Sequence, residues 1–148
     1  MRGLIGKKNG FTLLEVIVVL TLMTLILGLS TVYFAGFLPA AKLHATGREL
    51  AGLIRHARSL ARLNEETQTV VIDLDARTYG LKGQGSKKIP PSVLIRIADP
   101  VAGEVLQGKY PLVFQPAGGQ AGGAIFLTGG KKKLRLDMDP VTGAVVIK

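Results

Sequence analysis

Two groups of charged residues have types and positions that could do chemistry. Glu15 lies four residues into an apolar run that begins at Phe11. A carboxylate in such a run costs on the order of 2–3 kcal/mol unless it lies at the membrane interface or has a cationic partner. A basic run later in the chain could contact an anion such as a phosphate. The residues of this run are Lys131, Lys132, Lys133 and Arg135.

No pattern typical of a catalytic or metal site accompanies these charges. The chain has no cysteine, which excludes a disulfide framework, a cysteine zinc site and a thiol nucleophile. His44 and His56 are twelve residues apart, whereas a helical metal pair needs a spacing of four. The residues around Gly129, Asp137 and Asp139 lack the rest of a phosphate loop or an EF-hand. We therefore predict that the protein is not an enzyme and has no cofactor or metal site.

An apolar segment positions Glu15. Residues 16–38 include no formal charge, and as a helix they would span about 34 Å, enough for a bilayer core of about 30 Å. This run is longer than the apolar core of a secretory signal peptide, and Pro39 stands where a cleavage site needs a small residue. We expect a retained membrane helix. Arg2, Lys7 and Lys8 precede it and favour a cytoplasmic N-terminus.

A second helical pattern covers residues 40–66. Its apolar face consists of Leu43, Leu50, Leu53, Ile54, Ala57, Leu60 and Ala61. Another face carries the arginines Arg48, Arg55, Arg58 and Arg62. We expect the apolar face to pack on a sheet. The arginines are interpreted either as a solvated face near Glu65 and Glu66 or as a contact for another subunit or an anion.

The remaining residues, 67–148, predict six or so short strands. Alternating or strand-like segments fall at residues 69–75, 79–82, 93–98, 111–115, 124–128, 133–138 and 144–148. Turns are expected at 75–78 and 139–143, and loops at 83–91 and 116–123. One long N-terminal helix packed on an antiparallel sheet is an α+β fold.

The residues around Glu15 resemble a known signal. The run Lys7-Lys8-Asn9-Gly10-Phe11-Thr12-Leu13-Leu14-Glu15-Val16 is similar to the class III signal of type IV pilins and pseudopilins. The resemblance implies that a prepilin peptidase cuts between Gly10 and Phe11 and that Phe11 is then N-methylated. It also implies that Glu15 faces the N-terminal amine of a neighbouring subunit. This ammonium would compensate the charge of the carboxylate and set the axial register.

A narrower resemblance covers much of the remaining chain. Segment 48–61 with the hairpin after it, segment 114–118 and the turn at 140–143 are similar to minor subunits of the GspH/FimT class. The resemblance implies a pilin-like minor pseudopilin near the tip of a type II secretion pseudopilus. The expected parts are a leader at 1–10, a transmembrane helix at 11–38, a periplasmic continuation at 39–66 and a β-rich head at 67–148.

The same resemblance implies where the protein acts and with what. The expected location is the inner membrane, crossed once, with the C-terminal head in the periplasm. The expected partners are the prepilin peptidase, other minor and major pseudopilins, and inner-membrane lipid.

Two alternatives remain open. FimT-like minor type IV pilins take part in DNA uptake, and residues 40–148 carry 16 Lys+Arg against 9 Asp+Glu, which favours DNA attraction. No aromatic residue interleaves with the lysines at 131–133, so stacking on single strands is not supported, and DNA is not the favoured partner. The basic run is also explained as a charged edge that discourages strand aggregation. The other alternative is an unrelated single-pass membrane protein.

Overall fold

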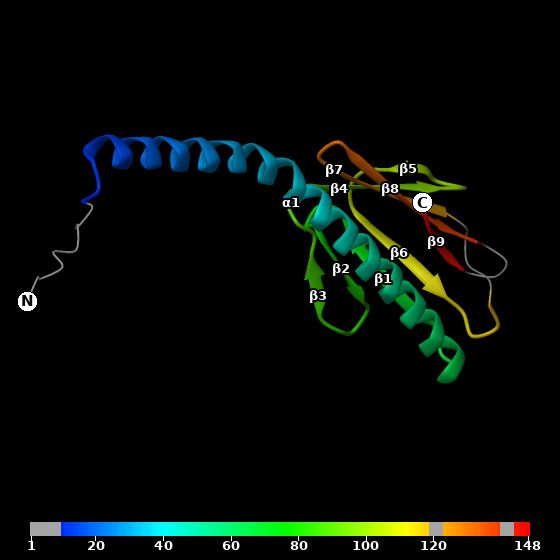
Figure 1. The fold of residues 1–148 in the computed structure, drawn as a ribbon. Coiled ribbons are helices and arrows are strands. Elements are labelled where there is room, and N and C mark those ends of the chain that lie inside the picture. Colours follow the sequence, from blue (N-terminus) through cyan, green and yellow to red (C-terminus); the bar gives the residue numbers. More distant parts are fainter. Residues whose placement is uncertain (1–9, 119–122, 140–143) are drawn as a thin grey trace, which may run out of the picture. The chain divides into compact units, whose positions relative to one another are not determined.

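The structure, a computed structural model, describes residues 10–118, 123–139 and 144–148 (Figure 1). One helix, α1 (Leu13–Leu63), precedes all of the strands. The chain divides into two compact units, one ending at Gly36 and the other beginning at Phe37. A long N-terminal helix followed by antiparallel sheets confirms the predicted α+β, pilin-like arrangement.

The first unit consists of the opening turns of α1. Within it, residues Leu13–Thr31 form a helix long and apolar enough to cross a membrane, and none of this stretch is buried inside the structure. A helix that is apolar and uncovered on every side is suited to lipid or to a protein assembly rather than to water.

The second unit contains two sheets in which every neighbouring pair is antiparallel. The four-stranded sheet has the order β3-β2-β1-β6. Its strands are β1 (Gln68–Asp73), β2 (Thr78–Leu81), β3 (Ser86–Lys88) and β6 (Lys109–Phe114). The five-stranded sheet has the order β5-β4-β7-β8-β9. Its strands are β4 (Val93–Asp99), β5 (Gly103–Val105), β7 (Gly123–Gly129), β8 (Lys132–Met138) and β9 (Val145–Ile147).

Two short strands were missed by the sequence pattern. The prediction of a loop over 83–91 is wrong at Ser86–Lys88, which pairs with β2 as β3. All three side chains of β3 are exposed, so no alternation of apolar and polar residues indicates a strand. β5 is equally short and pairs only at the edge of its sheet. The final hairpin is confirmed by the pairing of β8 with β9, although residues 140–143 of its turn lie outside the described residues.

The later turns of α1 pack against the two sheets around one core. The predicted apolar face is confirmed at Leu43, Leu50, Ile54, Ala57 and Ala61, all fully buried. Leu53 and Leu60 are only partly buried against this core. Strand residues of both sheets complete the cluster, including Val70, Ile72, Ile97, Ile125 and Leu136.

Glycines set how closely the helix approaches the five-stranded sheet. A Cβ atom at Gly129 on β7 would lie 2.9 Å from Leu43 Cβ and 3.0 Å from the Pro39 carbonyl oxygen. A Cβ atom at Gly47 of α1 would lie 2.5 Å from Leu134 Cδ2 on β8. The helix and the β7–β8 hairpin can therefore pack this closely because neither position carries a side chain.

Candidate functional site

Glu15 takes part in the start of α1. The Thr12 side-chain oxygen accepts a hydrogen bond from the Glu15 backbone N–H at 3.2 Å. Thr12 therefore occupies the N-cap position and Glu15 the third helical position, which is the sequence arrangement of a capping box. A negative charge in the first turn is also favoured by the helix dipole. In the part of the chain that the structure describes, Glu15 has no ion pair, so its charge is open to a partner.

The predicted processing site lies just before this helix. Gly10 and Phe11 precede the first helical residue, and Phe11 is 84% exposed. A Cβ atom at Gly10 would meet no atom within 4 Å. A protease binds its substrate in an extended conformation, which an exposed, non-helical segment can adopt. The local structure at the Gly10–Phe11 bond is therefore compatible with cleavage.

The basic run is divided between a turn and the two faces of β8. Lys131 lies in the β7–β8 turn, while Lys132 and Lys133 begin β8, and all three are exposed. Side chains alternate along a strand, so Lys133 and Arg135 share the outer face of the sheet. Arg135 is paired with Asp137 at 2.5 Å between Nε and Oδ1. The four predicted contact residues are close in space, but they do not form one uniform cationic surface.

An aromatic ring lies between two arginines on that outer face. Phe126 on β7 is directly opposite Arg96 on β4 and Arg135 on β8. The Arg135 guanidinium carbon lies 5.3 Å from the centre of the Phe126 ring, a cation–π distance. Arg96 also pairs with Glu104, 2.9 Å away. No sequence pattern indicates this arrangement, because it depends on the register of three strands.

The arginines of α1 face outward in the second unit. Arg48, Arg55 and Arg62 are exposed and Arg58 is half-buried. Three of them line a hollow of about 330 Å³ with Ser59 and Leu63. Within residues 10–118, 123–139 and 144–148 these arginines have no ion pair, so the expected neighbours Glu65 and Glu66 do not neutralise them. The helix ends at Leu63 and Glu65 has a φ of 55°, which turns the chain away from the helix.

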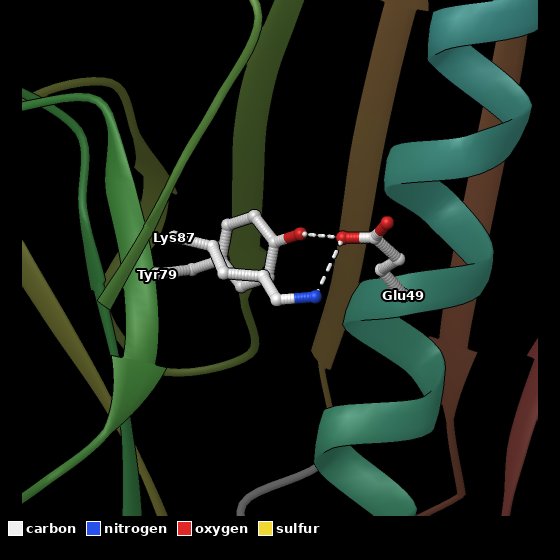
Figure 2. Close-up of polar contacts among 3 residues, drawn as sticks. All are labelled: Glu49, Tyr79 and Lys87. Atoms are coloured by element: carbon white, nitrogen blue, oxygen red, sulfur yellow. Dashed lines mark hydrogen bonds and ion pairs between the residues drawn. The ribbon is translucent and has the colours of Figure 1, made fainter. Parts of the chain in front are cut away.

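A polar network joins α1 to the β2–β3 hairpin. Glu49 Oε2 accepts a hydrogen bond from the Tyr79 hydroxyl at 2.9 Å and lies 3.2 Å from Lys87 Nζ (Figure 2). The hydrogen bond from Tyr79, followed by that from Lys87, lowers the pKa of Glu49. Burial and the bond to Glu49 raise the pKa of Tyr79. Glu49 is therefore held as a carboxylate at neutral pH.

A second network joins the two sheets. The Tyr110 hydroxyl on β6 donates a hydrogen bond to Asp99 Oδ2 at the end of β4. Asp99 Oδ1 accepts the backbone N–H groups of Val101 at 2.7 Å and Ala102 at 2.8 Å. The bond from Tyr110 and then these backbone bonds lower the pKa of Asp99. The site is structural, because it fixes the β4–β5 turn to the neighbouring sheet.

No candidate metal site occurs in the described segments. Residues 10–118, 123–139 and 144–148 contain no group of three histidine, aspartate or glutamate side chains placed to hold an ion.

Comparison with known proteins adds two observations. Residues 5–31 match the family described as a prokaryotic N-terminal methylation motif. The chain is 26% identical over 139 residues to type II secretion system protein H of Xanthomonas campestris pv. campestris, covering 94% of this chain and 82% of that protein. Comparison with solved structures found no significant match. The resemblance inferred from the sequence is thus confirmed: the chain carries a methylation motif of the type IV pilin class and is similar to a GspH protein over most of its length.

Proposed function

We propose that this chain is a minor pseudopilin of a type II secretion system, a structural subunit near the tip of the pseudopilus that supports protein export. The observation that carries the proposal is the similarity to a type II secretion protein H across 94% of the chain, together with the N-terminal methylation motif.

Maturation at the N-terminus is the first step of the proposed function. A prepilin peptidase would cut between Gly10 and Phe11, where the chain is exposed and non-helical. Phe11 would then become the methylated N-terminal residue. The new N-terminal amine would belong to Phe11, which directly precedes Thr12. Cleavage would therefore occur at the start of α1.

Assembly is the second step. The apolar part of α1 would anchor the subunit in the inner membrane with the head in the periplasm, and would later leave lipid for the core of the filament. The unpaired carboxylate of Glu15 would bind the N-terminal amine of a neighbouring subunit, because an isolated charge in either environment is costly. The partners are therefore the peptidase, other minor and major pseudopilins and membrane lipid. The role is structural rather than enzymatic.

A gene deletion with complementation tests this function directly. Removing the chain from its host should abolish secretion of type II cargo while leaving the cargo inside the periplasm, and the intact gene should restore export. Normal secretion without the chain would contradict the proposal. The purified pseudopilus tip should also contain the chain beginning at a methylated Phe11.

A second candidate, a FimT-like minor pilin that binds DNA, is favoured by one specific observation. The outer face of the five-stranded sheet combines the ring of Phe126 with Arg96 and Arg135. Aromatic rings and arginines are the side chains that stack on bases and contact phosphates, and a nucleic acid would here replace the pairs of Arg96 with Glu104 and of Arg135 with Asp137. The exposed Lys131, Lys132 and Lys133 lie on the adjoining turn and strand start.

Salt titration distinguishes the two candidates. DNA binding by the full chain in neutral detergent should be measured beside a variant with Lys131, Lys132 and Lys133 changed to alanine. Tight binding that weakens steeply with salt and disappears in the variant would establish the DNA-binding pilin. Absence of binding at moderate salt would leave the secretion pseudopilin.

A further inference from the structure

A groove of about 350 Å³ opens between α1 and the β2–β3 hairpin, all within the second unit. Glu49, Gly52, Leu53 and His56 line it from the helix, at spacings that place them on one stripe. The hairpin contributes Tyr79 and Lys87 among others. Its size lies within the range of sites that hold small organic groups, and the steps of maturation and assembly described above do not involve it.

Glycines keep the groove empty of side chains. A Cβ atom at Gly52 would meet no atom within 4 Å, and the same holds at Gly85 in the hairpin. Gly52 lies inside a helix, where glycine costs about 1 kcal/mol relative to alanine. Packing does not require glycine here, since a Cβ atom at this position would touch no neighbouring atom. The open space is therefore available to a group from outside the chain.

The carboxylate of Glu49 provides the polar end of the groove. Both hydrogen bonds from Tyr79 and Lys87 reach the same oxygen, Oε2 (Figure 2). Across the described residues, no group donates a hydrogen bond to Oε1. A carboxylate has about four acceptor positions, and this one is ionised and held in place by its two partners. Its second oxygen is thus ready to accept a charge-assisted hydrogen bond.

The polarity of this arrangement selects a cation. An anion entering the groove would compete with Glu49 for Lys87 and would be repelled by the carboxylate. A basic side chain would instead extend the network through Oε1. The stripe from Glu49 to His56 is about 10 Å long, which fits an extended arginine, and Leu53 and the backbone at Gly52 offer contact to its aliphatic stem.

We propose that this groove receives an arginine side chain from a neighbouring filament subunit, with Glu49 Oε1 accepting its guanidinium N–H groups. Arginine suits the site better than lysine because its planar group presents several N–H donors to one carboxylate. The identity of the partner rests on the proposed pseudopilin function, but the chemistry of the groove does not.

A titration with a small probe tests the chemistry. The full chain in neutral detergent is observed by NMR while N-acetyl-arginine amide is added, with N-acetyl-citrulline amide as the uncharged probe of the same shape. Saturable shifts of the Gly52 and Gly85 amides are expected, with at least tenfold weaker binding of the citrulline probe. Equal binding of the two probes, or preferential binding of N-acetyl-glutamate, would overturn the assignment.

Variants locate the binding in the groove. Glu49→Gln should abolish the preference for arginine over citrulline. Gly52→Leu places a side chain in the groove at a position where a Cβ atom meets no other atom within 4 Å, and should abolish binding while the protein stays folded. Ala41→Leu is the matched control, because Ala41 is exposed on the same helix and does not line this groove. Unchanged binding in Gly52→Leu would overturn the assignment.

The partner is tested in the filament. Gly52→Leu should reduce incorporation into the pseudopilus, whereas Ala41→Leu should not. Normal incorporation of Gly52→Leu would overturn the subunit contact. If the chain supports secretion but does not bind the arginine probe, the proposal of an arginine-binding groove is overturned and the proposed function stands. If secretion is unimpaired after deletion of the gene, the proposed function is overturned and the chemistry of the groove stands.

Discussion

Tyr110 on β6 donates its hydroxyl hydrogen to Asp99 on β4, so this side-chain pair connects the four-stranded sheet to the five-stranded sheet. The same carboxylate holds the β4–β5 turn through two backbone N–H groups. One ionisable group therefore takes part in both a contact between the sheets and a hairpin turn. Because of this arrangement, the stability of the head should depend on pH in the acidic range.

The first prediction concerns that acid dependence. The pKa of Asp99 is lowered in the folded chain, below its usual unfolded value of about 3.9. Its stabilising contribution is therefore full above about pH 5 and is lost as the pH falls through the folded pKa. Tyr110→Phe should lower the melting temperature at pH 7, and the difference from the wild type should shrink toward pH 3. A difference independent of pH over this range would contradict the mechanism.

A second prediction concerns the bond between the helix and the β2–β3 hairpin. Tyr79→Phe removes the hydroxyl that Glu49 accepts at 2.9 Å. We expect a loss of about 1 kcal/mol in the free energy of unfolding, measured by urea denaturation in neutral detergent. Glu49→Gln is the companion variant, since its amide oxygen still accepts the Tyr79 hydrogen. A loss from Glu49→Gln larger than that from Tyr79→Phe would assign the stability to the charge on Glu49 instead.

A third prediction separates close packing from open space at two glycines. Gly129→Ala places a Cβ atom 2.9 Å from Leu43 Cβ and 3.0 Å from the Pro39 carbonyl oxygen, so we expect a loss of about 1–3 kcal/mol. Gly52→Ala meets no atom within 4 Å and should raise the stability by up to about 1 kcal/mol. Equal effects of the two changes in thermal unfolding would show that the helix does not press on β7.

The fold was largely predictable because its signals are local. The apolar stripe of α1 and the alternation in β1, β4 and β8 each depend on spacing within one segment. β3 and β5 were missed because short edge strands bury little and show no alternation. The sequence therefore predicts elements that bury apolar faces and overlooks those that only pair at an edge.

The sequence could suggest residues for the candidate site only where they lie within one stretch of the chain. Gly10, Phe11 and Glu15 belong to a contiguous motif, and Lys131 to Arg135 form one run. The placement of Phe126 between Arg96 and Arg135 needs the register of three strands. The network of Glu49, Tyr79 and Lys87 spans separations of 30 and 38 residues. Neither can be derived from spacing along the chain.

A fourth prediction tests processing. Gly10→Ala should block cleavage by the prepilin peptidase, because the enzyme must approach the backbone closely at a residue without a side chain. Mass analysis of the N-terminus should then show the leader still attached and Phe11 unmethylated. Gly6→Ala is the matched control within the leader and should leave processing intact. A mature chain beginning at methylated Phe11 in the Gly10→Ala variant would contradict the requirement for glycine at position 10.

The last prediction separates two roles of Glu15. As the third helical residue after Thr12 it belongs to a capping box, a position that glutamine also fills well, while pairing with a neighbour's amine requires the charge. If the charge matters, Glu15→Gln should reduce incorporation into the pseudopilus as strongly as Glu15→Ala, with membrane insertion unchanged in both. Thr12→Ala, which removes the cap at a cost of about 1 kcal/mol, should reduce incorporation far less. Incorporation measured by crosslinking of assembled pseudopili decides between these roles, because normal assembly of Glu15→Gln with impaired assembly of Thr12→Ala would assign Glu15 to the cap alone.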